Sequence, residues 1–353
     1  MYGIVGYYPE SFTAESERQR YPHTMLKEIF DQPRAVRSTL DSVVDISENA
    51  YLSEALPPPD VLRAADRVLI IGSGTSFHAG VIGKYMIERM AGVPVEVEYA
   101  SEFTSRRPII RPRTLAIALS QSDEAADMVG ALRYARQRGA FSVAISNGFH
   151  SQLVVLYVLG LYMGQLQMHL TRKEFERRIA LLKDLPGHME HVLSSSDEIV
   201  PLAELLSNHS QALYAGRGIN YPIALEGALK LKEISSIHAE GCPAGELGHG
   251  PIALIDSRMP VVFVAPCDPL YRKTFSNIEE ARVRGGIILA VASERDHEID
   301  VVSDYVMRIP STDPFLNPLL AALPLQLLAY HAAVIRGCDM GNLQSLPKCV
   351  TVD

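Results

Sequence analysis

The chain has 353 residues, of which 47% are hydrophobic and 21% are charged. This balance excludes a disordered protein and predicts a sizeable buried core, and the length suits about two domains of ~150 residues each. The formal net charge of −8 argues against a protein that binds nucleic acid through its own charge.

Cysteine usage and hydropathy favour a cytoplasmic protein with no membrane contact. The four cysteines have no CxxC spacing, as is typical of reduced thiols in the cytosol: Cys242, Cys267, Cys338 and Cys349. The N-terminus has no basic segment that leads into an apolar one, so we expect no secretion signal. The longest apolar run, residues 153–163, is shorter than the ~18 residues that a membrane span needs.

Apolar runs of β type alternate with helical patterns, which predicts an α/β fold with doubly wound parallel sheets. The expected strands are 68–71, 115–119 and 141–145 in a first sheet, and 212–215, 260–264, 286–290 and 305–309 in a second. Residues 171–200 are charged and helical in pattern, with Pro186–Gly187 as an expected break. The predicted organisation is an N-terminal arm (1–34), a first domain (35–170), a linker (171–195), a second domain (196–340) and a C-terminal tail (341–353).

The two halves read as a divergent repeat with an offset of 144 residues. This offset aligns 71–76 with 215–220 and 101–103 with 245–247, which favours duplication. Similar helical patterns begin at Gln152 and Gln326. In the second half Gln326 follows Ser293 by 33 residues, whereas in the first half Gln152 follows Ser146 by 6. We therefore predict that the first domain lacks one strand.

Two hydroxyl-rich loops follow predicted strands of the first half. One contains Gly74, Thr75 and Ser76, and the other contains Ser120, Gln121 and Ser122. Each is compatible with a simple helix cap, and Ser120 with Asp123 fits a capping box. Ligands of open α/β sheets bind outside the carboxyl ends of the strands, however, and helix N-termini attract anions. Neither loop matches a P-loop or a full GxGxxG motif, so a small phosphorylated ligand fits better than a nucleotide.

A charged helical segment opens the second half. Glu226, Lys230 and Glu233 fall at i, i+4 and i+7, on one face of a helix. Solvated salt bridges would produce the same pattern. The segment leads into the glycine-rich run 241–251, in which His249 lies between glycines and is better suited to a site than to a core. The histidines form no metal-ligand motif, and we expect neither a metal nor a cofactor.

On these residues the chain resembles the isomerase portion of glucosamine-6-phosphate synthase (glutamine–fructose-6-phosphate aminotransferase), which is built from two sugar isomerase (SIS) domains. The resemblance runs from residue 22 to the tail at 346–353, with the most specific markers at 74–76, 120–122, 224–235 and 245–251 and at Lys348.

The resemblance implies a role for each matching residue. Ser76, Ser120, Gln121 and Ser122 would bind the sugar phosphate. Glu233 would move a proton between C1 and C2 of the open-chain sugar, and Lys230 would assist at the sugar oxygens. His249, supplied by the neighbouring subunit of a homodimer, would open the ring, and Lys348 would form a Schiff base with the ketose. An enediol intermediate needs such a base, a nearby cation and the exclusion of water.

Three departures from the family affect these expectations. The glutamine-hydrolysing domain is absent from this sequence, although residues 1–7 resemble its start, with Tyr2 where the family has its nucleophilic cysteine. Asp123 and Ala125 stand where the family usually has glycine and threonine. The gap after Ser146 removes a strand and a segment that lines the sugar pocket in the family.

Two functions follow. The first is a phosphosugar aldose–ketose isomerase that aminates or deaminates without glutamine, using free ammonia or ammonia from a separate glutaminase partner. The second is a non-catalytic sugar-phosphate sensor. A sensor needs the serine loops but has no use for Glu233, His249 and Lys348 together.

Overall fold

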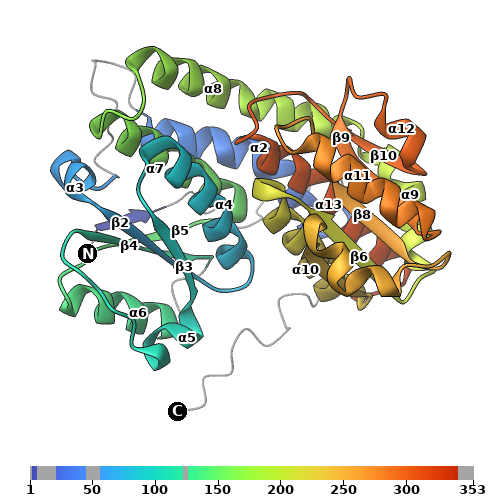
Figure 1. The fold of residues 1–353 in the computed structure, drawn as a ribbon, viewed down its shortest axis with the longest axis horizontal. Helices are drawn as coiled ribbons and strands as arrows, with labels where there is room; N and C mark the ends of the chain where they lie inside the picture. The colour runs from blue at the N-terminus through green and yellow to red at the C-terminus, as the bar shows by residue number, and fades with distance from the viewer. Residues whose placement is uncertain (1, 6–20, 45–55, 122–125, 341–353) are drawn as a thin grey trace. The chain divides into compact units, whose positions relative to one another are not determined.

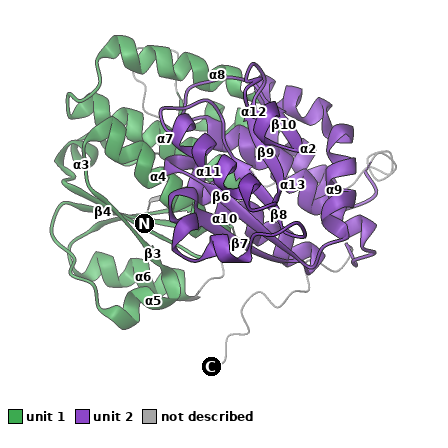
Figure 2. Ribbon diagram, turned by 45° about the vertical axis from the view of Figure 1, so that its right-hand side comes forward, with its two compact units in different colours: residues 1–10, 34–186 green, residues 11–33, 187–353 purple. Residues whose placement is uncertain are grey.

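The computed structural model describes residues 2–5, 21–44, 56–121 and 126–340. The chain forms two compact units, of which unit 1 comprises residues 1–10 and 34–186 and unit 2 comprises residues 11–33 and 187–353 (Figure 2). Each unit contains one five-stranded sheet in which every described pair of neighbouring strands is parallel. This is the α/β architecture that the alternating pattern predicts.

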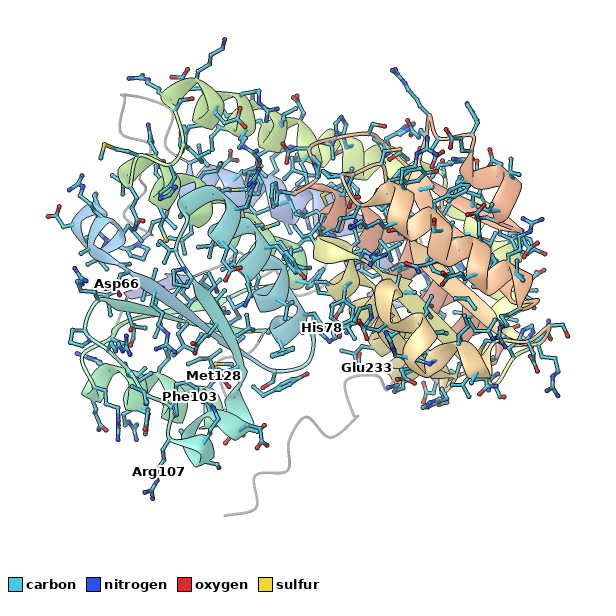
Figure 3. All side chains as sticks on the ribbon, viewed as in Figure 1. Asp66, His78, Phe103, Arg107, Met128 and Glu233 are labelled. Carbon is cyan, nitrogen blue, oxygen red and sulfur yellow. The ribbon has the colours of Figure 1, made fainter. Side chains whose placement is uncertain are left out.

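The sheet of unit 1 has the order β1-β5-β4-β2-β3 (Figure 1). Its strands are β1 (Tyr2–Val5), β2 (Arg67–Gly72), β3 (Val95–Tyr99), β4 (Thr114–Ser120) and β5 (Phe141–Ser146). The helices are α3 (Pro59–Ala64), α4 (Thr75–Ala91), α5 (Ala100–Arg106), α6 (Ala126–Gln137) and α7 (Phe149–Leu166). Phe103 and Met128, labelled in Figure 3, pack with Leu69 and Ala116 in the core between the sheet and helices α5 and α6.

Unit 2 repeats this topology with the order β10-β9-β8-β6-β7. Its strands are β6 (Gln211–Gly216), β7 (His238–Pro243), β8 (Pro260–Val264), β9 (Ile287–Ser293) and β10 (Tyr305–Ile309). The α-helices are α9 (Val200–Ser207), α10 (Tyr221–Ser235), α11 (Tyr271–Val283), α12 (Ile299–Val302) and α13 (Asn317–Ile335). Short 3-10 helices are η1 (Ser196–Ile199), η2 (Gly218–Asn220), η3 (Ala244–His249) and η4 (Pro251–Leu254).

The sheet of unit 1 is not one strand short, and this part of the prediction needs correction. The chain passes from β5 to α7 with no strand between them, as the gap implies. The fifth position is instead filled by β1, which pairs in parallel with β5 and aligns Tyr2 with Val143 and Val5 with Ser146. It occupies the place beside β5 that β10 occupies beside β9. The expected N-terminal arm thus contributes a strand to unit 1.

Two long helices cross the boundary between the units. Helix α2 (Thr24–Val43) and helix α8 (Arg172–Ser194) each belong in part to both units. The expected break at Pro186–Gly187 is wrong, because α8 continues through both residues. A proline in a helix removes one backbone hydrogen bond. The buried side chains of Leu182, Leu185 and Met189 anchor α8 on both sides of this position.

Helices α7 and α13 are long and apolar enough to cross a membrane, by length and composition alone. Most of each helix is buried inside the protein, at 89% for α7 and 83% for α13. Burial on all sides explains an apolar composition without a membrane, because such helices have no solvated face. The absence of membrane contact stays a prediction.

Candidate active site

The predicted phosphate loops lie at the carboxyl edge of the sheet of unit 1, where the order in which strands are added to the sheet reverses. From β2 the chain first adds β3 on one side and then β4 on the other, so the carboxyl ends of β2 and β4 flank a topological switch point. Gly74, Thr75 and Ser76 follow β2, whereas Ser120 ends β4 and Gln121 follows it. The fold therefore brings the two loops to one edge of one sheet.

Helix α4 begins directly against the end of β2. A Cβ on Gly72 would lie 2.8 Å from the carbonyl oxygen of Ser76, so only glycine permits this approach. Gly74 is the N-cap, with φ +52°, and it has no side chain that could cap the first helical amides. Thr75 and Ser76 are buried in the first turn. A helix start of this kind favours an anion.

A buried glutamine on α7 connects the two loops. The amide nitrogen Nε2 of Gln152 lies 3.0 Å from Ser76 Oγ and 3.1 Å from the backbone oxygen of Ser120. Gln121 is exposed. Ser122 lies outside the described residues, as do Asp123 and Ala125, so the expectations for them stay untested.

Three charged residues of unit 2 form a cluster on α10. Lys230 Nζ lies 2.8 Å from Glu233 Oε2 and 3.8 Å from Glu226 Oε1. The exposed fraction of the side chains rises from 2% for Glu226 through 21% for Lys230 to 41% for Glu233. Glu233, labelled in Figure 3, is therefore the carboxylate of the cluster that solvent and ligands can reach. The predicted helical face is confirmed.

The charges of this cluster compensate one another. Burial works to lower the pKa of Lys230, but the neighbouring carboxylates of Glu226 and Glu233 outweigh it and hold this pKa above its usual value. Lys230 is consequently a permanent cation at neutral pH. A fixed cation beside an accessible carboxylate can stabilise the negative charge that develops while the carboxylate moves a proton.

His249 ends the 3-10 helix η3 that follows β7. Buried Ala244 and Leu247 anchor this loop, while the histidine itself is exposed. Gly250 follows with φ +143°, which side-chain-bearing residues rarely adopt. His249 makes no hydrogen bond to Glu226, Lys230 or Glu233 in the described part of the chain. Lys348 lies outside the described residues.

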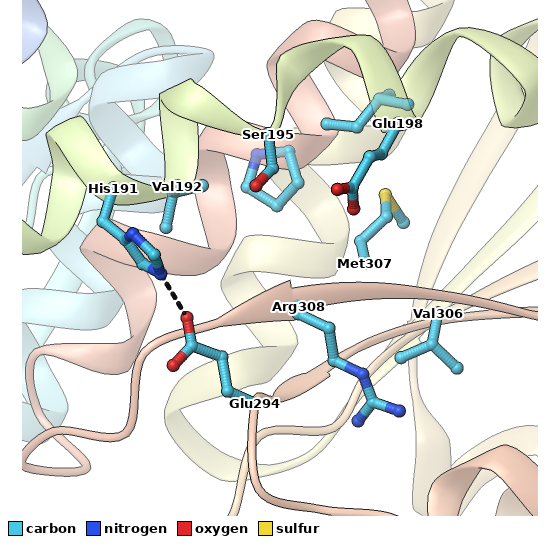
Figure 4. Close-up of a pocket in the computed structure, with 10 residues that line it drawn as sticks. His191, Val192, Ser195, Glu198, Glu294, Val306, Met307 and Arg308 are labelled. Carbon is cyan, nitrogen blue, oxygen red and sulfur yellow. Dashed lines mark hydrogen bonds and ion pairs between the residues drawn. The ribbon is translucent and has the colours of Figure 1, made fainter.

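Two hollows elsewhere contain none of the predicted site residues. One, of about 280 Å³, is lined by Arg67, Pro94, Glu96 and Arg111 at the amino ends of β2 and β3. The other lies in unit 2 beside the His191–Glu294 pair, whose nitrogen and oxygen are 2.8 Å apart (Figure 4). Its volume of about 50 Å³ has room for little more than water. Within the described ranges no group of three or more His, Cys, Asp or Glu is arranged to hold a metal ion.

Comparison with known proteins identifies the class that this fold represents. The model of the SIS domain matches residues 61–163 and 205–336, one match in each unit and together well over half of the chain. The chain belongs to the SIS domain family, and it carries the domain twice.

Within the family, the chain is similar to glutamine–fructose-6-phosphate aminotransferases. The isomerizing enzymes of Chlorobaculum tepidum and Bacteroides thetaiotaomicron are 41% and 40% identical to 96% of this chain. The chain spans about 59% of the length of the first and 60% of the second. The solved C-terminal domain of the Francisella tularensis glucosamine-fructose-6-phosphate aminotransferase superposes with a TM-score of 0.86 and 33% identity, over 92% of this chain and 99% of that domain. The resemblance inferred from the motifs is confirmed.

Sequence reasoning missed two polar residues of unit 1, Gln152 and Asn147. In the sequence Gln152 marks only the start of a repeated helical pattern, and no pattern singles out Asn147. The signal was present, because Gln152 begins an otherwise apolar run on a helix that is buried from residue 149 to 164. A fully buried amide in such a position must find partners in the fold.

Proposed function

We propose that this chain is a phosphosugar aldose–ketose isomerase of the glucosamine-6-phosphate synthase type. Its substrates are fructose 6-phosphate and glucosamine 6-phosphate, and it works in the cytoplasm without hydrolysing glutamine. The observation that carries the proposal is the Glu226–Lys230–Glu233 cluster, which combines a permanent cation with an accessible carboxylate. Membership of the SIS family and likeness to the aminotransferases support it.

The roles proposed for the phosphate loops and for the cluster on α10 follow from the positions of their residues, each within its own unit. The amides at the start of α4 and the hydroxyls of Ser76 and Ser120 bind the phosphate, because all of them lie at the carboxyl ends of the neighbouring strands β2 and β4, at the switch point. Glu233 removes a proton from C1 and returns it to C2, and Lys230 stabilises the enediol oxygen between the two steps. His249 and Lys348 keep the ring-opening and Schiff-base roles that the family resemblance implies.

The proposed amination uses ammonia directly. Ammonia adds to the C2 carbonyl of fructose 6-phosphate and water leaves, which forms a C2 imine. Transfer of one C1 proton to C2, with the C1 hydroxyl proton passing to the nitrogen, then yields the C1 aldehyde and the C2 amine of glucosamine 6-phosphate. The same steps in reverse release ammonia. The ammonia comes from solution or from a separate glutaminase partner.

A homodimer is part of the proposal, because the family resemblance assigns His249 to the site of a neighbouring copy. The exposed position of His249 within its own chain is compatible with this assignment. We expect sedimentation to show a dimer at micromolar concentration. A fully active monomer at that concentration would contradict this part of the proposal.

The activity is tested by incubating the chain with fructose 6-phosphate and ammonium, and separately with glucosamine 6-phosphate, and following the products by mass. We expect glucosamine 6-phosphate in the first reaction and fructose 6-phosphate with ammonia in the second. Binding of both sugars without conversion of either would favour the non-catalytic sensor.

A further inference from the structure

Gln152 touches three segments that follow three different strands of unit 1. Its side chain is completely buried near the start of α7. Nε2 lies 3.0 Å from Ser76 Oγ after β2, 3.1 Å from the Ser120 oxygen at the end of β4, and 2.8 Å from the Asn147 oxygen after β5. One amide thus joins the ends of β2, β4 and β5.

The chemistry of these partners determines the direction of each hydrogen bond. Backbone carbonyl oxygens only accept, so the amide nitrogen and not the amide oxygen must face Ser120 and Asn147. An amide nitrogen has two N–H groups and no lone pair to offer, so the Ser76 hydroxyl is the acceptor in its contact with Gln152, from an N–H that is shared with one of the two carbonyls. The hydroxyl proton of Ser76 is left to point elsewhere, and a proton in that state can be donated to an anion.

The short connection after β5 places Gln152 at this point. Only Asn147 and Gly148 separate β5 from α7, so the first turn of α7 starts at the carboxyl edge of the sheet. The backbone N–H of Asn147 donates to the Ser120 oxygen at 3.0 Å, which ties two of these three segments together a second time. Gln152 Oε1 and Asn147 Nδ2 are buried and have no hydrogen-bond partner among the described residues.

We propose that Gln152 is a positioning residue for the phosphate of the substrate. By donating to the Ser76 oxygen, Gln152 leaves the Ser76 hydroxyl proton available for the phosphate. It also fixes the spacing between the loops that follow β2 and β4. The inference rests on the proposed function, because it assumes that these loops bind a phosphosugar. It assigns a task to a residue that does not itself contact the substrate.

The test compares Gln152→Leu with Gln326→Leu. Gln326 on α13 of unit 2 is the residue that the repeat aligns with Gln152. It is 7% exposed and accepts a hydrogen bond from Gln32 at 2.7 Å. Both variants thus remove a buried amide from an apolar helix. Calorimetric titration with fructose 6-phosphate, competition by inorganic phosphate, KM, kcat and melting temperature are measured for both variants and for the wild type.

For Gln152→Leu we expect the Kd and the KM for fructose 6-phosphate to be about tenfold higher than in the wild type. Inorganic phosphate should compete more weakly by a similar factor, and kcat should stay within about twofold of the wild-type value. Gln326→Leu should melt earlier but keep the wild-type Kd. Gln152→Asn retains the amide but shortens its reach, and it provides the same test if the leucine variant does not fold. An unchanged Kd in either folded Gln152 variant overturns the inference and leaves the proposed function standing. A wild type that does not bind fructose 6-phosphate overturns both.

Discussion

Lys230 donates a hydrogen bond to Glu233 across 2.8 Å, one turn apart on the same helix. The third member of the cluster, Glu226, lies deeper and 3.8 Å from the lysine. Because Lys230 shares its charge between a buried and an accessible carboxylate, the accessible one can lose or gain a proton without leaving the lysine unpaired. This arrangement connects the stability of α10 with the chemistry proposed for it.

Glu233→Gln should keep the affinity for fructose 6-phosphate and abolish product formation. The amide preserves the shape of the side chain but cannot accept a proton at neutral pH, and a lost general base costs about 100- to 10,000-fold in rate. Calorimetry measures the affinity, and mass analysis of the products measures turnover. Glu240→Gln, an exposed change on the neighbouring β7, should leave both unchanged. Wild-type turnover in Glu233→Gln would exclude this residue as the base.

Glu226→Gln should lower the free energy of unfolding by about 2 kcal/mol at neutral pH, because Lys230 then keeps only one carboxylate partner. The effect should depend on pH in a defined direction. The folded-state pKa of Lys230 lies above its usual value of 10.5, so its stabilisation is complete below that pH and disappears as the pH rises through the folded pKa.

Urea unfolding of the wild type and of Glu226→Gln at increasing pH measures this dependence. The difference between the two proteins should be constant up to about pH 10 and shrink above it. The comparison between variants cancels the titration of other lysines and of tyrosines. A difference that grows with alkaline pH would show that the sign of the coupling is wrong.

Ser120→Ala should raise the KM for fructose 6-phosphate about tenfold and change kcat little. Its hydroxyl is proposed to donate to the phosphate in the ground state and in the transition state alike, which is uniform binding. Ser142→Ala is the matched control, because Ser142 lies at the other end of the neighbouring strand β5. Steady-state kinetics of both variants decide the matter. A lower kcat at unchanged KM in Ser120→Ala would argue against a phosphate-binding role.

A proline at Gly3 or at Ile4 tests the role of β1 in the sheet. Successive backbone amides of a strand point to opposite sides, so only one of these two can face β5. Proline at that position should lower the free energy of unfolding by about 1–3 kcal/mol and speed hydrogen exchange in residues 143–146, whereas the other variant should be much milder. Equal and negligible effects of both prolines would contradict the pairing of β1 with β5.

Apolar residues predominate in the seven strands predicted from the sequence, and all seven occur in the structure. The three that were missed lie at sheet edges. Strand β3 alternates valine with glutamate, and β7 contains glycine and proline, because each has only one neighbouring strand and one side open to solvent. Strand β1 was missed for a different reason: its partner β5 is more than 130 residues away in the chain, and local patterns carry no information on such a pairing.

The glycine turns show where sequence reasoning works best. Gly74 and Gly218, aligned by the repeat, follow the equivalent strands β2 and β6 with φ of +52° and +55°. A glycine turn depends on residues close together in the chain, so the sequence predicts both turns. Their equal places in the two halves also indicate the duplication. The Gln152 contacts depend instead on three loops that meet only in the folded sheet. Only the presence of a buried amide, and not its partners, could be read from the sequence.

Proton exchange in the wild-type chain tests the central claim most directly. Fructose 6-phosphate is incubated with the chain in D₂O without ammonium and recovered, and its mass is measured by mass spectrometry. An isomerase that passes through an enediol exchanges the C1 proton with solvent, so the account predicts recovered sugar that is one mass unit heavier, and no gain with Glu233→Gln. Fructose 6-phosphate that binds to the wild type but returns without deuterium would contradict the account.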